Sequence, residues 1–472
     1  MAKDLRDFIT TLEERAPDEI AHVHREVDPH FEIASLVRRM EDTRSHGYPA
    51  LVCHDVTGYP DWRVMTNLCG TDRRMAEALD TTVEEAIKEY SRRVTNPIDP
   101  VEVASGPVKD VVLTGDDVDL GAIPFLSHTP EEPAPFMDGE VFVTYDEENE
   151  RYNTGIYRMM RKGPRKTGVF FAQGTHAYSI YTQHEARDEP MEFAAVVGHH
   201  PAVVMGCQVQ TVEDEYRAIG GVLGEPLELV DCETVDLKVP ANAELVVEGT
   251  VLPGVREEEG PFCEFTYLLG EERVSPVTEV TAITHRKDPI YLDVYNPGVE
   301  HINIGKLPME ADIYRKAKDA VSQVTDVYMP AEASRTVAFV QVRKEYEGLG
   351  KQAAIAAASA KYFPKIIVVL DEEQDIRNLG EVFWAMSMKT RPDRDISFVK
   401  DAYVENLIPT ATTGRGWPDT EGGVDTKVFI DATKPLDVEY PCQCEPPVDI
   451  WSSIDLDEYL EGPEALAPPA AD

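Results

Sequence analysis

Residues Thr336–Leu370 read TVAFVQVRKEYEGLGKQAAIAAASAKYFPKIIVVL, and this stretch decides the fold class. It predicts a strand at Thr336–Val342, an alanine-rich helix at Lys351–Tyr362 and a fully buried strand at Lys365–Leu370, because an apolar run, a helix-forming run and a β-branched run follow one another. Such a β-α-β unit has a right-handed crossover, which gives parallel strands covered by a helix. We therefore expect a mixed α/β protein.

The segments around this unit extend it into a C-terminal α/β domain, which we place at residues 298–472. A helix at Ala311–Val324 is expected before the unit, and a helix at Leu379–Met388 and a strand at Lys427–Asp431 after it. These elements predict a partly parallel sheet with helices on its faces. The last thirty or so residues are rich in Pro, Glu and Ala and lack a core pattern, so we interpret them as an interface arm or a frayed tail.

The N-terminal residues 1–106 predict a small α/β lobe. An opening helix places Leu5, Phe8, Ile9 and Leu12 on one apolar stripe. Prolines after residue 95 end regular structure and mark the exit from the lobe. The elements expected in between are strands at Ala50–Cys53 and Arg63–Leu68 and helices at Arg73–Ala78 and Thr82–Arg93.

The central residues 107–297 predict a β-rich domain that resembles a barrel. Two helical interruptions are expected, one at Tyr178–Arg187 and one just before Gly224. The predicted strands include Gly168–Phe171, Ala202–Met205, Glu244–Glu248 and Val277–His285.

Composition restricts the partners and the setting. The 472 residues carry 87 acidic and 45 basic side chains, a formal charge of −42 that repels nucleic acid and anionic membrane surfaces. Because the acids are spread along the whole chain, we interpret them as a solvated shell suited to high salt and expect a halophilic source. There is no apolar stretch of roughly 18 residues and no secretory leader, and the seven scattered cysteines suit a reducing compartment, so we expect a cytoplasmic protein without a membrane span.

Three metal-binding residue types occur in the central domain, namely Asn153, His176 and Glu215, on segments expected to be β-rich. An oxygen-rich set with one imidazole suits Mn²⁺ or Mg²⁺ better than a thiophilic ion. Taken singly, each residue also has a plain structural interpretation, as a turn residue, a loop histidine and a solvated helix acid.

The run EEEGPFCE at Glu257–Glu264 joins carboxylates to a Gly-Pro turn. The turn could bring Glu259 and Glu264 together, and neighbouring carboxylates push their pKa values apart, so that one can hold and release a proton near neutral pH. An arginine would steady the ionised partner, and Arg158 is the candidate. A charged hairpin loop is the alternative interpretation.

Several stretches, in order along nearly the whole chain, resemble the UbiD family of decarboxylases. The resemblance is carried by VMTNLCGT at Val64–Thr71, NTGIYR at Asn153–Arg158, QGTH at Gln173–His176, LELVDCETVDLKVP at Leu227–Pro240, EEGPFCE at Glu258–Glu264, FWAMSMKTRP at Phe383–Pro392 and DATKP at Asp431–Pro435. It implies an N-terminal α/β lobe, a central flavin-binding split barrel and a C-terminal domain used for dimerisation, in agreement with the domains expected above.

The resemblance also implies a chemistry, the reversible non-oxidative decarboxylation of an aromatic, heteroaromatic or α,β-unsaturated acid. The cofactor would be prenylated FMN, which accepts the electron pair that CO₂ leaves behind. Its phosphate would be held through Mn²⁺ (or Mg²⁺) and a nearby K⁺, with Asn153, His176 and Glu215 as the metal ligands by position. Glu264 would return the proton, aided by Arg158 and Glu259. The cofactor-binding residues implied by position are Asn153, Thr154, Gly155, Ile156, Arg158, Gln173, His176 and Glu215.

Substrate choice is implied by EHINIGKLPMEA, in which His301 falls where the family contacts the substrate. Family members that act on furan dicarboxylate carry an arginine where this chain has Met309, which cannot pair with a second carboxylate, so we expect a monocarboxylic acid. His301 could equally be a structural loop residue. A lysine of some members falls on Ser359, with Lys361 nearby, which leaves its role open.

Other functions are weighed against this one. Anhydromevalonate phosphate decarboxylation, within the same family, is the leading alternative. A flavin-binding oxidoreductase would need a hydride donor, and no G-x-G-x-x-G motif follows an expected strand. A non-catalytic relative would most simply lack part of the Glu-Arg-Glu set, which is intact. The partners we expect are a small carboxylic acid, a flavin prenyltransferase that supplies the cofactor, and further copies of this chain in a homodimer or larger homo-oligomer.

Overall fold

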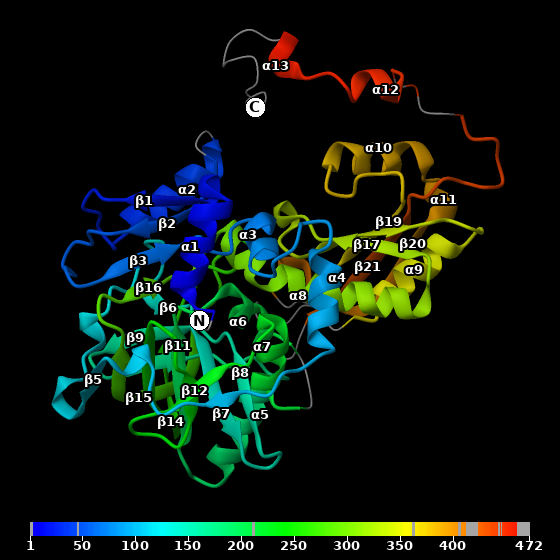
Figure 1. Cartoon of the computed structure of the whole chain (residues 1–472). Coiled ribbons are helices and arrows are strands. Elements are labelled where there is room, and N and C mark those ends of the chain that lie inside the picture. Colours follow the sequence, from blue (N-terminus) through cyan, green and yellow to red (C-terminus); the bar gives the residue numbers. More distant parts are fainter. Residues whose placement is uncertain are drawn as a thin grey trace. The chain divides into compact units, whose positions relative to one another are not determined.

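A computed structural model of the chain describes residues 3–44, 47–209, 213–360, 364–404, 407–411, 423–441, 444 and 446–459 (Figure 1). Met1–Thr433 form one compact unit, and Lys434–Asp472 form a second, small one that contains α12 (Val448–Trp451) and α13 (Leu456–Tyr459). Helices and strands alternate through the first unit, which confirms the mixed α/β class. None of the helices in the described part combines the length and the apolar composition that crossing a bilayer requires.

The N-terminal lobe is built on a four-stranded sheet. Its strands are β1 (Ile20–Val23), β2 (Ala50–Cys53), β3 (Arg63–Thr66) and β16 (Ile290–Leu292), in that order. β1 pairs with β2 in parallel, and β16 pairs with β3 in parallel. The predicted stripe on α1 (Leu5–Arg15) is confirmed, because all four of its apolar side chains are buried. The remaining helices are α2 (Glu32–Thr43), α3 (Asp72–Glu77) and α4 (Ala86–Val94).

The central domain contains one antiparallel nine-stranded sheet, ordered β6-β9-β10-β15-β14-β11-β7-β8, with β5 paired to β15. Among the described residues the end strands β6 and β8 do not pair with each other. The strands are β5 (Val111–Thr114), β6 (Phe136–Met137), β7 (Val141–Asp146), β8 (Arg151–Gly155), β9 (Met159–Gly163), β10 (Lys166–Val169), β11 (Met191–Val197), β14 (Leu245–Glu259) and β15 (Arg273–His285).

A three-stranded sheet and three helices lie beside this large sheet. The sheet is formed by β13 (Lys238–Pro240), β12 (Glu228–Asp231) and β4 (Val101–Glu102). The helices are α5 (His176–Ala186), α6 (Pro201–Gly206) and α7 (Glu215–Leu223), and the two that were predicted from the sequence are α5 and α7.

The strand predicted at Ala202–Met205 is wrong, because these residues form α6. Pro201 occupies the first turn, where its missing N–H costs nothing, and His200 caps the helix by accepting a bond from the N–H of Ala202 at 3.1 Å. All six residues of the helix are buried, so its sequence has no polar face. A short, wholly apolar run cannot be assigned to helix or strand from its periodicity.

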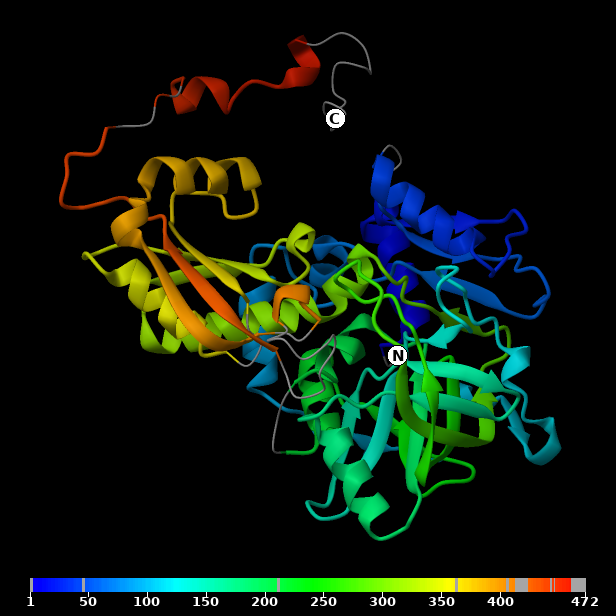
Figure 2. The same cartoon turned by 180° about the vertical axis from the view of Figure 1, so that it is seen from behind.

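The C-terminal sheet has the order β17-β18-β19-β21-β20, and its three central strands are parallel, as predicted. α8 and α9 lie on one face and α10 on the other (Figures 1 and 2). The elements are α8 (Val299–Ala320), β17 (Val324–Tyr328), β18 (Val337–Val342), α9 (Leu349–Ala357), β19 (Ile366–Asp371), α10 (Leu379–Lys389), α11 (Pro392–Asp395), β20 (Ile396–Val404) and β21 (Gly423–Asp431).

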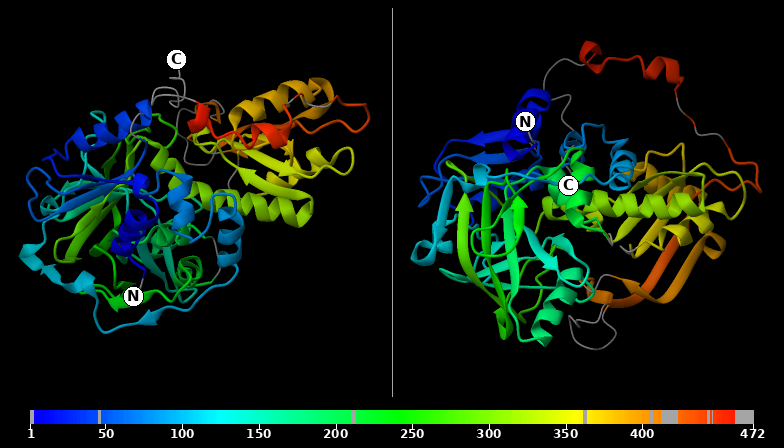
Figure 3. Two further views of the ribbon diagram at one scale, coloured as in Figure 1. Left: turned by 45° about the horizontal axis from the view of Figure 1, so that its top comes forward. Right: turned by 60° about the horizontal axis from the view of Figure 1, so that its bottom comes forward.

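α8 begins well before the helix predicted at Ala311–Val324 and ends earlier. Gly305 and Pro308 lie inside it, and both residue types argue against a helix in a single sequence. Burial of most of its first half overrides that local preference. α8 packs against α4 and α6 as well as against α9 and β17, and Figure 3 shows it passing from the central domain to the C-terminal sheet.

Two short strands cross the domain boundaries expected from the sequence. β16, at the end of the central segment, joins the N-terminal sheet, and β4, at the end of the N-terminal segment, joins β12. The boundaries at residues 106 and 297 stay a prediction.

Candidate active site

Arg158 joins two buried acids in one hydrogen-bonded cluster. It lies between β8 and β9, whereas Glu259 ends β14 and Glu264 follows in the next loop. Its Nε donates to Oε1 of Glu259 at 2.9 Å, its Nη2 donates to Oε2 of the same acid at 3.2 Å, and its Nη1 donates to Oε1 of Glu264 at 2.5 Å. None of the three residues is more than 9% exposed. The structure thus brings together the three residues that the sequence grouped.

Two aromatic rings contact the guanidinium of Arg158. Its Cζ lies 4.9 Å from the ring centroid of Phe170 and 4.6 Å from that of Phe262. Burial alone would lower the pKa of Arg158, but the attraction of Glu264 and Glu259 outweighs it and raises that pKa above its usual value. The arginine is therefore a permanent cation in a nearly dry site.

The loop that carries Glu264 is fixed by its own backbone. The N–H of Glu264 donates to the carbonyl of Leu268 at 3.1 Å, and Cys263 forms an isolated bridge with Leu269. The N–H of Cys263 donates to Oε1 of Glu132 at 3.1 Å. Glu264 uses only Oε1 in its bond to Arg158, and the described residues offer no hydrogen bond to its Oε2. That oxygen is therefore available to a bound molecule.

Arg273 is a second cation at this site, which the sequence reasoning missed. It is the cross-strand partner of Glu259, and its Cζ lies 4.4 Å from the ring centroid of Phe170. Its Nε is buried without a hydrogen-bond partner among the described residues. Burial, followed by repulsion from Arg158, lowers its pKa. Arg273 could not be placed from the sequence, because its position opposite Glu259 depends on the register of the β14–β15 hairpin. The long loop at residues 260–272 makes that register impossible to read from the sequence.

The predicted metal ligands meet where two helices begin beside β8. Asn153 is on the strand, but His176 and Glu215 are the first residues of α5 and α7, so the expectation that they lie on β-rich segments is wrong for both. Nδ1 of His176 lies 3.2 Å from Oε1 of Glu215. Oε2 of Glu215 accepts from the N–H of Thr154 at 2.5 Å and from its hydroxyl at 3.0 Å. The plain interpretation of Glu215 as a solvated acid is wrong, since only 4% of it is exposed.

This arrangement fits a metal-bound phosphate. The side-chain Nδ2 of Asn153 is buried and has no partner among the described residues. Because the nitrogen and oxygen of an amide can exchange places by a flip, either atom could occupy this position and contact a ligand. Helix N-termini carry unpaired N–H groups and a partial positive charge, and here two of them adjoin. An imidazole, a carboxylate and an amide are suitable ligands for Mn²⁺ or Mg²⁺.

Three of the other predicted cofactor residues, Thr154, Gly155 and Ile156, lie at the end of β8. Gly155 has no room for a side chain, because an added Cβ would lie 2.6 Å from the ring of Tyr157. Ile156 lines a cavity together with Asp138 and Glu300. Gln173 is exposed in the loop before α5, and the structure does not bring it into contact with the other predicted residues among those described.

His301 lies at the site, whereas Met309 lies two turns further along α8. The His301 ring meets Phe262 and Phe265 edge-on, with centroids 6.2 Å and 6.0 Å apart. Burial and then the nearby Arg335 and Arg158 lower the pKa of His301 well below its usual value, so the ring is neutral. Met309 packs against the core under the C-terminal sheet. Ser359, two residues past the end of α9, donates to the carbonyl of Ala356 in that helix, and Lys361 lies outside the described residues.

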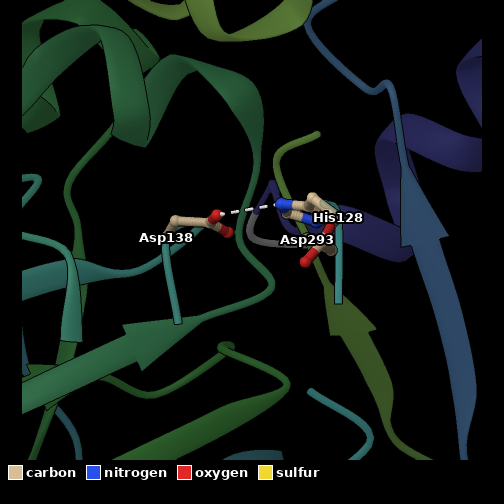
Figure 4. A group of neighbouring side chains, drawn as sticks. All are labelled: His128, Asp138 and Asp293. Atoms are coloured by element: carbon tan, nitrogen blue, oxygen red, sulfur yellow. Dashed lines mark hydrogen bonds and ion pairs between the residues drawn. The ribbon is translucent and has the colours of Figure 1, made fainter. Parts of the chain in front are cut away.

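His128, Asp138 and Asp293 form a buried group that the sequence did not indicate. Nε2 of His128 is 3.0 Å from Oδ2 of Asp293, and Nδ1 is 3.7 Å from Oδ2 of Asp138, whose carboxylate points at the ring in Figure 4. Ligand atoms of the three lie within 4.8 Å of one another, a spacing that suits a metal ion. Oδ1 of each aspartate has no partner among the described residues. The three positions are too far apart in the sequence to give a motif.

Family models match three successive parts of the chain. Residues 12–94 match the N-terminal domain, residues 100–299 the Rift-related domain and residues 302–432 the C-terminal domain of UbiD, the 3-octaprenyl-4-hydroxybenzoate carboxy-lyase. The chain is also 31% identical to an anhydromevalonate phosphate decarboxylase of Methanothermobacter thermautotrophicus, over 92% of this chain and 97% of that protein.

Solved structures of UbiD-class enzymes and of other decarboxylases are similar to this chain. The UbiD-class enzyme HmfF of Pelotomaculum thermopropionicum in complex with FMN is 33% identical, with a TM-score of 0.89 over 97% of this chain and 100% of that one. An evolved dimeric form of HmfF in complex with prFMN gives 32% identity and a TM-score of 0.86 over the same shares. The 3,4-dihydroxybenzoic acid decarboxylase AroY of Klebsiella pneumoniae gives 25% and 0.86, over 95% of this chain and 99% of that one. With its three domains matched in order, the chain belongs to the UbiD family of carboxy-lyases.

Proposed function

We propose that this chain catalyses the reversible, non-oxidative decarboxylation of an aromatic, heteroaromatic or α,β-unsaturated carboxylic acid at the cluster of Arg158, Glu259 and Glu264. The observation that carries the proposal is the buried arginine that bridges two acids, one of which keeps an oxygen free. Membership of a decarboxylase family and similarity to AroY support the reaction class.

Prenylated FMN is the proposed cofactor, since similar structures hold FMN or prFMN. When bound, it supplies the sink for the electron pair released with CO₂. Asn153, His176 and Glu215 would hold its phosphate through Mn²⁺ or Mg²⁺ with a nearby K⁺, at the adjoining N-termini of α5 and α7. Thr154, Gly155, Ile156 and Gln173 complete the proposed binding segment.

In the proposed reaction, Glu264 returns a proton to the carbon that has lost CO₂. Arg158 orients that acid and offers charge to the incoming carboxylate, and Glu259 fixes Arg158 through its two-pronged contact. The rings of Phe170 and Phe262 exclude water from the guanidinium. A dry site strengthens each of these electrostatic contacts.

The substrate that fits best is a monocarboxylic acid with an unsaturated or aromatic body. A neutral His301 between Phe262 and Phe265 offers a ring edge and one hydrogen-bonding nitrogen, and its buried Nδ1 has no partner among the described residues. Met309, which replaces the arginine of the furan-dicarboxylate members, packs under the C-terminal sheet and supplies no charge for a second carboxylate. Anhydromevalonate phosphate is the second candidate, favoured by the relative from Methanothermobacter thermautotrophicus.

Self-association through the C-terminal domain is proposed as well. α10 exposes Phe383 at 63% and Met388 at 58%, and the edge strand β20 exposes Phe398 at 65%. Apolar surface of this kind is typical of protein interfaces. A homodimer would cover it.

The test is to produce the full chain with and without a flavin prenyltransferase and to assay CO₂ release from a panel of acids. The panel holds benzoic, furoic and cinnamic acids, a dicarboxylate and anhydromevalonate phosphate. We expect turnover of one acid class only after prenyltransferase co-expression, together with a changed flavin spectrum. Bound prenylated flavin without CO₂ release from any of these acids would contradict the proposal, and release from the phosphate alone would favour the second candidate.

A further inference from the structure

Three histidines gather on the N-terminal sheet, outside the candidate active site. β1 and β2 pair in parallel with Val23 opposite Cys53, so the next residues, His24 and His54, are neighbours across the two strands. His22 is two residues before His24 and therefore points to the same face of the sheet. This places three imidazoles on one small area of surface.

The rings are in contact. Nδ1 of His22 lies 2.9 Å from Nε2 of His54, and the rings of His24 and His54 stack with centroids 4.5 Å apart. Glu13 on α1 adds a carboxylate, with Oε1 3.0 Å from Nε2 of His22. The rings of His22 and His24 also stack, with centroids 6.2 Å apart. Three imidazoles and one carboxylate therefore lie side by side at this surface.

We propose that His22, His24 and His54 bind a divalent transition ion such as Zn²⁺, Ni²⁺ or Cu²⁺, with Glu13 or water as the fourth ligand. Imidazole is a preferred ligand of these ions, and three histidines with one open position is an established zinc arrangement. The ion replaces the two hydrogen bonds that His22 now makes, because the ring nitrogens must turn toward one centre. Turning is easy for side chains at the surface, where rotamers interconvert rapidly.

This inference does not depend on the proposed function, because none of these residues belongs to the Arg158 cluster or to the Asn153 set. The acidic surface raises the local concentration of any cation, but that diffuse attraction is screened by salt. Coordination bonds to imidazole are not screened in this way. Salt therefore separates a built site from adventitious binding.

The experiment is equilibrium dialysis of the full chain against Zn²⁺ at pH 7.5 and about 2 M KCl, where the Debye length is below about 3 Å. Excess Mn²⁺ is present throughout to occupy the proposed cofactor site, since Mn²⁺ binds imidazole sites the most weakly of the series. We expect the wild-type chain to bind one more Zn²⁺ than a variant with His22→Asn, His24→Asn and His54→Asn. The matched control is His30→Asn, in the same lobe, whose imidazole bonds to Ser127 and not to the three clustered histidines. This variant should bind Zn²⁺ as the wild type does.

Zn²⁺ should also raise the melting temperature of the wild type and not that of the triple variant, because a ligand that binds only the folded state stabilises it. If the triple variant does not fold, His24→Asn serves instead. His24 is exposed and its side chain makes no hydrogen bond among the described residues, so the substitution should leave the fold intact. Its loss should weaken Zn²⁺ binding at least about 10-fold. Equal zinc content in the wild type and in the triple variant (or in His24→Asn where that variant replaces it) would overturn the proposal. Zinc binding that disappears in 2 M KCl would overturn it as well. The rate of CO₂ release should be the same in the triple variant as in the wild type. The zinc measurement can therefore be interpreted even if the proposed decarboxylase function is wrong.

Discussion

Arg273 lies directly across the β14–β15 pair from Glu259, which places a second guanidinium beside the buried acid cluster. Its Nε has no partner among the described residues, so it has a donor available for an incoming carboxylate. We expect Arg273→Gln to raise the KM of the acid about 10-fold, with a smaller change in kcat, since a hydrogen bond to a charged group contributes about 1.5–3 kcal/mol. Steady-state kinetics measure this. Arg273→Lys should recover part of the loss, and an unchanged KM in Arg273→Gln would rule out the contact.

Glu264→Gln tests the proton donor. Glutamine keeps the size and one hydrogen-bond acceptor for Arg158 but cannot deliver a proton, so kcat should fall roughly 100- to 10,000-fold while flavin content stays the same. The matched control is Glu258→Gln, an exposed acid in the same run, which should retain wild-type turnover. Turnover of Glu264→Gln equal to that of the control would remove Glu264 from its role.

Arg158 is also expected to matter for stability, because it neutralises two buried acids. Arg158→Gln leaves both carboxylates without their cation, and breaking a buried pair in this way costs about 3–5 kcal/mol. The double variant Arg158→Gln with Glu259→Gln should be destabilised by less than the sum of the two single changes. Urea unfolding of the four chains measures the coupling, and simple additivity would contradict it.

Salt should stabilise the protein. With a formal charge of −42, the folded chain repels itself, and dissolved ions screen that repulsion. We expect the melting temperature to be lower in 0.1 M than in 2 M KCl, because the Debye length falls from about 10 Å to below about 3 Å. Thermal melts in KCl and in an uncharged osmolyte separate screening from general solvent effects. Equal melting temperatures at both salt concentrations would refute the expected halophilic adaptation.

Acid should destabilise the fold through His200. Burial lowers the pKa of this side chain to about 3, whereas in the unfolded chain it takes a proton below about 6.5. The unfolded state therefore binds more protons between these values, and stability falls as the pH drops from 6.5 to 3, by up to about 1.4 kcal/mol per pH unit. His200→Asn keeps an acceptor for the N–H of Ala202 but does not titrate, so its unfolding free energy should fall less steeply over that range.

Much of the fold could be predicted because local patterns determine it. The stripe on α1 and the β18-α9-β19 unit both follow from short-range periodicity and appear as expected. α6 and the start of α8 could not be predicted, since both are buried segments in which tertiary packing decides between conformations that the local sequence leaves balanced.

The candidate site divides in the same way. The positions of Arg158, Glu259 and Glu264 were indicated by a motif and a resemblance, and the structure brings them together. Arg273 and the group around His128 were not foreseen, because each depends on contacts between residues that are far apart in the chain. Strand register and the paths of loops bring these distant residues together, and neither can be read from a single sequence.

The N-terminal sheet is completed by β16, which the ribosome makes only after the whole central domain. Until residue 292 has been translated, β3 has an open edge, and open strand edges are sites of aggregation. The lobe that is synthesised first is therefore among the last to be finished. An excised lobe that ends near residue 106 would retain this unpaired edge permanently, so the intact chain is the better choice for expression.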